Sequence, residues 1–143
     1  MLEVDLHHRL GGFTLAARFV APAGITVLFG RSGSGKTTIV NALAGLLRPE
    51  AGRIAVGERV LLDTAAGVWQ PAHRRRVGYI FQEGRLFPHL SVAQNLRYGA
   101  WLAPRNAPRV PFDKVVELLG IGALLSRRPG ALSGGEKQRV AIG

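Results

Sequence analysis

Cysteine is absent from this chain of 143 residues, and methionine occurs only once. Without cysteine, the fold can hold no disulfide bond and no thiolate metal site. This fits a reducing compartment such as the cytoplasm. Hydrophobic residues nonetheless make up 47% of the sequence, which is typical of a chain that folds around a core. The length suffices for one domain with a single core.

Acidic residues are scarce, with 9 Asp and Glu against 19 Lys and Arg, so the formal charge is +10. Such a basic chain can attract nucleotides, nucleic acid or anionic lipid headgroups. Two arginine runs, Arg74-Arg75-Arg76 and Arg127-Arg128, are interpreted as solvated faces. Because no basic tail or base-stacking platform accompanies them, we expect no nucleic-acid partner.

Long apolar runs are also missing, since none approaches the ~20 residues that span a bilayer. The N-terminus, Met1 to Asp5, lacks the basic and then apolar layout of a signal peptide. We therefore expect the chain to stay in the cytoplasm and to reach a membrane only through a partner.

The first part of the chain is rich in strand signals. Apolar and polar residues alternate over Leu2 to Leu6 and Phe13 to Val20, which predicts two half-buried strands joined by a turn at Gly11-Gly12. Residues 52–62 predict a hairpin, and residues 63–73 predict an irregular loop.

Two further segments, Ile25 to Phe29 and Val77 to Phe81, are nearly all apolar and predict strands buried on both faces. From Lys36 the apolar residues recur at helical spacing, and Arg48-Pro49 is predicted to end that helix, with Gly45 inside it.

Helix signals dominate after Gln82. They predict a helix capped by Ser91 and ended by Gly99, a proline-rich connector over residues 104–111, a helix over Phe112 to Leu119, and a last helix with a Ser133–Glu136 capping box. The sequence thus divides into a strand-rich part, residues 1–82, and a helical part, residues 83–143.

The segment Gly30 to Thr37, which we call the glycine loop, is the strongest functional signal. It reads Gly-x-x-x-x-Gly-Lys-Thr between a predicted strand and a predicted helix, as a phosphate-binding loop requires. Backbone N–H groups and the helix N-terminus would surround the phosphates, Lys36 would reach the β- and γ-phosphates, and Thr37 would bind Mg²⁺. The expected phosphate-binding residues are Gly30, Arg31, Ser32, Gly33, Ser34, Gly35, Lys36, Thr37 and Thr38.

A second motif, Leu132 to Gln138, reads Leu-Ser-Gly-Gly-Glu-Lys-Gln. Together with the glycine loop it resembles the signature of ATP-binding-cassette (ABC) ATPases. The resemblance implies an α/β fold of the P-loop NTPase type, incomplete here, with ATP and Mg²⁺ as cofactors. It also implies a homodimer in which Ser133, Gly134, Gly135 and Glu136 face the ATP of the opposite subunit.

The same resemblance suggests two further site residues. Gln82 is similar to the family's Gln-loop residue, which touches Mg²⁺ and the attacking water and is the only catalytic residue expected here. Phe13 is the candidate for stacking on adenine, the alternative being an ordinary core residue.

Two stretches, Arg76 to Gln82 and Leu86 to Val92, look like importer ATPases. With Asn95 to Gly99, Gly134 to Gly143 and Leu10 to Phe13, they look most like those for molybdate. The resemblance implies a peripheral subunit at the cytoplasmic face of the inner membrane. It would couple ATP hydrolysis to import through a permease, with a periplasmic solute-binding protein as an indirect partner. The alternatives are another importer (sulfate, iron or sugar), a non-transport ABC ATPase and a non-catalytic nucleotide-binding remnant.

In the family, an aspartate for Mg²⁺, a catalytic glutamate (Walker B) and a switch histidine follow the signature helix. None of these is present in this chain, which ends at Gly143. Since hydrolysis needs a group that positions the attacking water, we expect the 143-residue chain alone to bind ATP weakly, to turn it over negligibly and to be prone to aggregation.

Overall fold

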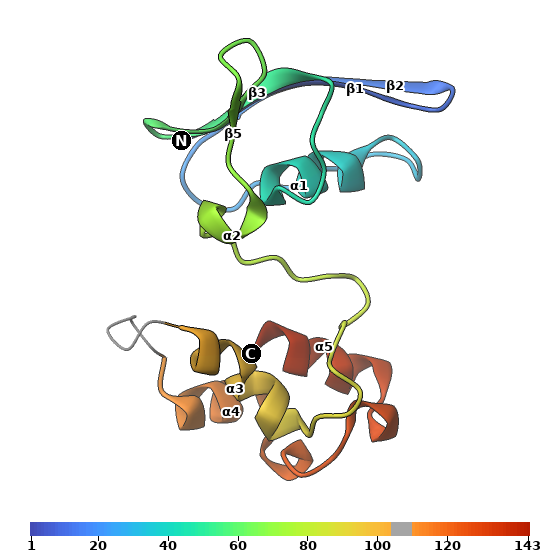
Figure 1. The fold of residues 1–143 in the computed structure, drawn as a ribbon. Coiled ribbons are helices and arrows are strands. Elements are labelled where there is room, and N and C mark those ends of the chain that lie inside the picture. Colours follow the sequence, from blue (N-terminus) through green and yellow to red (C-terminus); the bar gives the residue numbers. More distant parts are fainter. Residues whose placement is uncertain (104–109) are drawn as a thin grey trace. The chain divides into compact units, whose positions relative to one another are not determined.

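The computed structural model describes residues 1–103 and 110–143 and divides into two compact units, residues 1–79 and 80–143 (Figure 1). Most of the predicted connector, residues 104–109, lies outside the described residues. The division into a strand-rich part, residues 1–82, and a helical part, residues 83–143, stays a prediction.

The first unit is built on an antiparallel sheet. Its strands are β1 (Leu2–Leu10), β2 (Phe13–Ala21), β3 (Ala51–Val56), β4 (Arg59–Asp63) and β5 (Val68–Trp69), in the order β2-β1-β3-β4-β5. The predicted hairpins over residues 2–20 and 52–62 are confirmed. The register pairs Leu6 with Ala17 and His8 with Leu15, so the inward-facing residues of β1 and β2 lie on one face.

The core of this unit lies between the sheet and helix α1 (Lys36–Ala44), which covers one face of the strands (Figure 1). The buried residues are Val4, Leu6, Ala42, Ile54, Leu61 and Leu62. Each of the buried valine, leucine and isoleucine side chains contributes roughly 1.5–3 kcal/mol to folding. The sheet thereby fixes the position of α1 and of the loop that leads into it.

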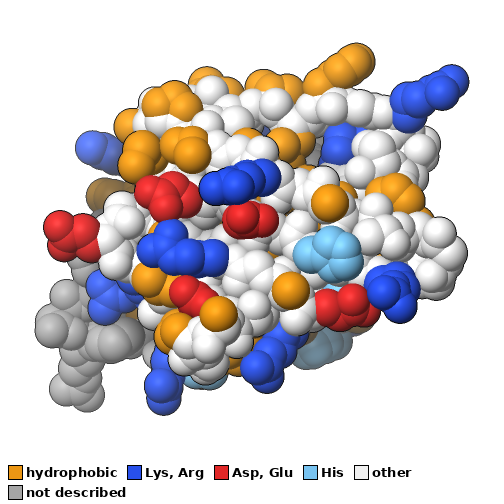
Figure 2. Space-filling model, turned by 90° about the horizontal axis from the view of Figure 1, so that it is seen from above, with side chains coloured by type: hydrophobic (Ala, Val, Ile, Leu, Met, Phe, Trp, Pro, Cys, Tyr) orange, Lys and Arg blue, Asp and Glu red, His pale blue; other side chains and the backbone are white. Residues whose placement is uncertain are grey.

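On the opposite face of the sheet, basic and acidic side chains stand next to one another, with exposed hydrophobic side chains among them (Figure 2). Arg53 forms ion pairs with Glu3 at 2.9 Å and with Asp63 at 3.7 Å, and Arg18 pairs with Asp5 at 3.6 Å. This face is therefore a solvated surface whose charges largely compensate one another.

The two predicted buried strands, Ile25 to Phe29 and Val77 to Phe81, are wrong for this structure, because neither segment adopts a strand. The side chains of Ile25 and Phe29 are 98% exposed. A strand needs neighbours that satisfy its backbone N–H and C=O groups, and no described strand pairs with either segment. Apolar, β-branched composition describes what fits inside a sheet but does not supply the partner strand.

Two boundaries in this unit also differ from prediction. Helix α1 ends at Ala44, because Gly45 adopts a left-handed φ of 79° and its N–H bonds back to the Ala42 carbonyl oxygen. The predicted loop over residues 63–73 contains β5 and the start of the short helix α2 (Ala72–Arg75).

The second unit is helical, with α3 (Val92–Leu102), α4 (Phe112–Leu119), α5 (Gly134–Ile142) and 3₁₀ turns at Gly122–Leu124 and Pro129–Ala131. Its buried core consists of Val92, Ile121, Leu124, Leu132 and Val140. The predicted helix over 112–119 is confirmed. Helix α3 continues past Gly99, where the prediction ended it, because the Ala103 N–H still bonds to the Gly99 carbonyl oxygen at 3.0 Å.

Candidate nucleotide-binding site

The glycine loop leads directly into α1, whose first residue is Lys36. Gly33 and Gly35 adopt left-handed φ values of 80° and 90°, which side chains with a Cβ rarely tolerate. A Cβ on Gly35 would also come within 2.8 Å of Leu15 Cδ1. The glycines thus allow the loop to turn sharply while it lies against strand β2, and they leave the N-terminus of a nine-residue helix open.

The Lys36 side chain folds back over its own loop. Its ammonium group donates to the carbonyl oxygens of Gly30 at 2.8 Å and Arg31 at 2.7 Å, and to Ser34 Oγ at 3.3 Å. These oxygens hold the positive charge at the mouth of the glycine loop, where a phosphate group would pair with it. The backbone amides of the helix N-terminus, the Lys36 ammonium and the Thr37 hydroxyl together therefore fit the phosphates of a nucleoside triphosphate.

The glycine loop and the β1–β2 hairpin together form a cavity of about 460 Å³, a size typical of ligand pockets. Its lining residues are Leu10, Phe13, Ser32, Gly33, Gly35, Lys36, Thr37 and Thr38. Phe13 is 40% exposed, and a Cβ on Gly35 would lie 3.4 Å from its Cε1. The structure thus brings Phe13 to the same cavity as several of the predicted phosphate-binding residues, with no carboxylate among the lining residues.

Gly30, Arg31 and Ser34 do not line this cavity; they supply the oxygens that hold Lys36. Gln82 is exposed and belongs to the second unit, so its role beside Mg²⁺ and water stays a prediction. Within the described residues no group of three or more His, Cys, Asp or Glu could hold a metal ion.

The signature segment forms the N-terminus of α5, as its capping box predicted. Ser133 Oγ accepts from the Glu136 N–H at 3.3 Å, and the Glu136 carboxylate accepts from the Ser133 N–H at 2.7 Å. Hydrogen bonds to the carboxylate from the backbone N–H and the side chain of Ser133, with the nearby charges of Arg127 and Arg139, lower the pKa of Glu136. Gly134 and Gly135 are exposed, and a Cβ on either would meet no atom within 4 Å. The helix end is therefore formed and open.

Arg75 is the residue that sequence reasoning missed. The interpretation of Arg74-Arg75-Arg76 as a solvated face is wrong at its centre, because Arg75 is only 2% exposed. Its guanidinium donates to the carbonyl oxygens of Ala42 at 2.6 Å, Leu43 at 3.0 Å and Gln70 at 2.6 Å. Burial lowers the pKa of Arg75. A cation at the C-terminal end of α1 is stabilised by the helix carbonyls, and no sequence pattern indicated this contact.

Comparison with known proteins gives a consistent result. The ABC transporter family model matches residues 19–143. Over 142 residues, the chain is 59% identical to the molybdenum import ATP-binding protein ModC of Mesorhizobium japonicum, covering 99% of this chain and 38% of that protein. It is 57% identical to the ModC of Paramagnetospirillum magneticum, covering 39% of that protein. The chain thus spans about two fifths of the length of these relatives.

Solved structures agree on the fold. An ATP-binding subunit of an ABC transporter superposes with a TM-score of 0.75 at 30% identity, covering 99% of this chain and 59% of that one. An ATP-binding cassette in a dimeric, post-hydrolysis state with ADP and Pi superposes with a TM-score of 0.67 at 24% identity, covering 67% of its length. The described residues therefore form a partial ABC ATPase fold.

No helix among the described residues is long and apolar enough to cross a membrane. With the family model covering the chain from residue 19 onward and the glycine loop and signature both formed, this chain belongs to the ABC transporter family.

Proposed function

We propose that this chain is the ATP-binding part of a subunit that couples ATP hydrolysis to molybdate import. The observation that carries the proposal is the cavity that joins Phe13 of β2 to Lys36 and Thr37 of the glycine loop. An aromatic side chain and a phosphate-binding helix N-terminus at one cavity are what a nucleotide with a base and a phosphate chain requires.

In this proposal each residue has a distinct task. Phe13 stacks on the adenine, the loop amides bind the phosphates, and the Lys36 ammonium exchanges its loop oxygens for phosphate oxygens. Thr37 and Gln82 would hold Mg²⁺, which would neutralise the negative charge of the phosphate oxygens, while ATP itself carries the phosphoanhydride bond that is hydrolysed. The signature residues Ser133 to Glu136 face the ATP bound by a second copy. In the homodimer, each of the two ATP sites is therefore completed by the signature of the other copy.

The molybdate assignment rests on the relatives, which are named as molybdenum import proteins at 59% and 57% identity. By this reasoning the subunit works at the cytoplasmic face of the inner membrane, against a permease fed by a solute-binding protein.

Nucleotide binding by the full chain tests the site. We expect Lys36→Ala to weaken binding of a fluorescent ATP analogue with Mg²⁺ by about tenfold or more, since it removes a charge-assisted contact to two phosphates. Phe13→Ala should weaken binding while Phe13→Tyr retains it. The matched control is Lys114→Ala, an exposed lysine on α4 that should leave affinity unchanged. Equal affinities for Lys36→Ala and Lys114→Ala would contradict the site.

A chimera tests the transported ion. Residues 1–143 would replace the matching part of the Mesorhizobium relative, in cells that lack their own molybdate importer. We expect the chimera to restore molybdate uptake and Lys36→Ala to abolish it. A chimera that accumulates, binds ATP and supports no uptake would refute the assignment to molybdate import and leave the nucleotide site standing.

A further inference from the structure

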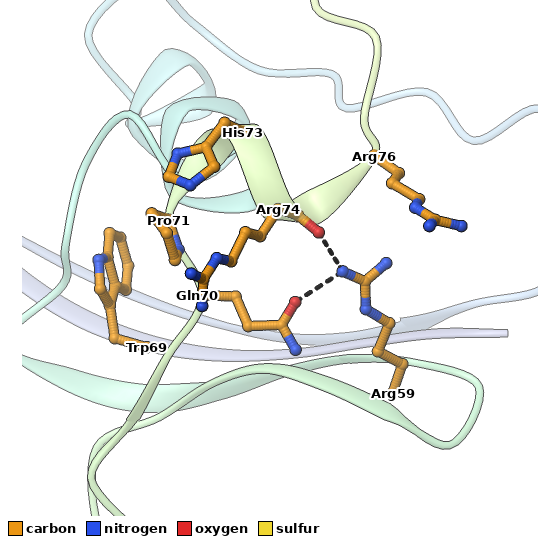
Figure 3. Close-up of a pocket in the computed structure, with 7 residues that line it drawn as sticks. All are labelled: Arg59, Trp69, Gln70, Pro71, His73, Arg74 and Arg76. Atoms are coloured by element: carbon orange, nitrogen blue, oxygen red, sulfur yellow. Dashed lines mark hydrogen bonds between the residues drawn. The ribbon is translucent and has the colours of Figure 1, made fainter. Parts of the chain in front are cut away.

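The first unit holds a second cavity, of about 710 Å³, on the side of the molecule where α2 follows β5 (Figure 3). Three arginines, Arg59, Arg74 and Arg76, line it together with Trp69, Gln70 and His73. None of these residues lines the cavity between the glycine loop and the β1–β2 hairpin. The proposed ATP site therefore leaves this cavity without a function.

Among the described residues, no ion pair compensates the positive charge of this cavity. No aspartate or glutamate is among its lining residues. The ion pairs of the described residues are those of Arg18 and Arg53, and none involves a cavity arginine. Like charges held together in this way repel one another, and a bound anion would relieve the repulsion.

One of the three arginines is held in place. Arg59 donates to the side-chain oxygen of Gln70 at 2.7 Å and to the Arg74 carbonyl oxygen (Figure 3). It also donates to the Arg75 carbonyl oxygen at 3.1 Å. These contacts tie β4 to helix α2. Because a guanidinium carries five N–H donors, Arg59 keeps donors beyond the three described bonds.

The segment that carries the other two arginines is fixed as well. Arg75, between them, is buried and bonds to the Gln70 carbonyl oxygen at 2.6 Å. Arg74 and Arg76 flank this anchor, and both are exposed at the cavity. A rigid backbone carrying two exposed guanidinium groups lowers the entropy that ligand binding must overcome.

We propose that this cavity binds a phosphate-type oxyanion, either inorganic phosphate or the phosphomonoester group of a small molecule. Planar guanidinium groups match the geometry of phosphate oxygens and pair with them through two parallel hydrogen bonds. Arg74 and Arg76 provide the movable donors, and Arg59 provides the fixed one. The cavity volume leaves room for an organic group beside the phosphate, against the ring of Trp69.

The test must exclude binding at the glycine loop. The full chain carrying Lys36→Ala is therefore titrated by calorimetry with inorganic phosphate and, separately, with glycerol 3-phosphate at constant ionic strength. We expect saturable binding at one site per chain. Adding Arg74→Gln and Arg76→Gln should weaken it by about tenfold or more, because two charge-assisted contacts are lost.

The matched control adds Arg9→Gln and Lys114→Gln to the same background, which removes two exposed positive charges outside the cavity. It should bind as the Lys36→Ala chain does, and circular dichroism should show all variants equally folded. Tighter binding of either probe identifies the source of the phosphate and supports the proposal. Binding of neither probe, or equal weakening by the control pair, would overturn it. Because Lys36 is already replaced, these outcomes do not depend on the proposed ATP site.

Discussion

Replacement of Arg75 is expected to destabilise the first unit more than any other single arginine change. In Arg75→Ala, the carbonyl oxygens of Leu43 and Gln70 lose the only hydrogen-bond donors described for them. Both of these hydrogen bonds are partly buried, and a carbonyl left unsatisfied on burial costs about 1–3 kcal/mol. The guanidinium also lies 4.5 Å from the centre of the Trp69 ring, and this packing is lost too. Together these losses give about 3–5 kcal/mol of unfolding free energy.

Urea unfolding followed by fluorescence measures this loss. The chain has two tryptophans, and Trp69 belongs to the first unit while Trp101, 63% exposed, belongs to the second. In a Trp101→Phe background, Trp69 alone therefore reports the unfolding of residues 1–79. With a typical urea slope of about 1–2 kcal/mol per M, the midpoint should fall by roughly 1.5–5 M, or the unit should already be unfolded in buffer.

Arg74→Ala is the matched control for this experiment, because it removes the same side chain from the exposed neighbouring position. Exposed substitutions of this kind change stability by about 0.5 kcal/mol or less. Arg75→Met, which keeps an unbranched stem but no donor, should behave like Arg75→Ala. If the midpoints of Arg75→Ala and Arg74→Ala coincide, the reasoning that the buried guanidinium anchors the end of α1 is refuted.

Three further predictions concern the loop, helix α3 and the signature. Gly35→Ala should reduce ATP-analogue binding at least about tenfold in the same fluorescence titration, because a φ of 90° and a 2.8 Å approach to Leu15 exclude a Cβ; affinity equal to the unsubstituted chain would contradict this. Asn95→Ala removes four side-chain hydrogen bonds to the loop before α3. It should lower the free energy of unfolding of the second unit, measured in urea, by about 2 kcal/mol. Asn95→Asp keeps the acceptor oxygen and should lower this free energy by less. Glu136 has a lowered pKa, so its stabilisation of the α5 cap is present above the pKa of an unfolded glutamate and is lost as pH falls through the lowered value. In that pH range, hydrogen exchange of the Ser133 amide should accelerate relative to the Glu136→Gln variant. Parallel exchange profiles for the two proteins would count against a role of the Glu136 carboxylate in the cap.

The sequence predicted some elements of secondary structure correctly and failed at others. The two hairpins, the helix over 112–119 and the Ser133–Glu136 capping box were predictable, because turns, helix caps and alternation depend on residues a few positions apart. The strand prediction failed at Ile25 to Phe29, because strand pairing depends on segments elsewhere in the chain.

The candidate site shows the same division. The glycine loop could be found from spacing alone, since one continuous segment supplies the amides, the ammonium and the hydroxyl. Arg75 could not, because the carbonyl groups that bury it come from α1, some thirty positions earlier in the chain.

By itself, the sequence determined the glycine loop and the capped signature helix, because each is formed by residues that are consecutive in the chain. Only the tertiary structure decided that Phe13 reaches the cavity of Lys36 and Thr37, and that three arginines from β4 and the α2 segment line a second one. The physical reason is that a cavity is formed by side chains from separate segments, which packing of the sheet against α1 brings together.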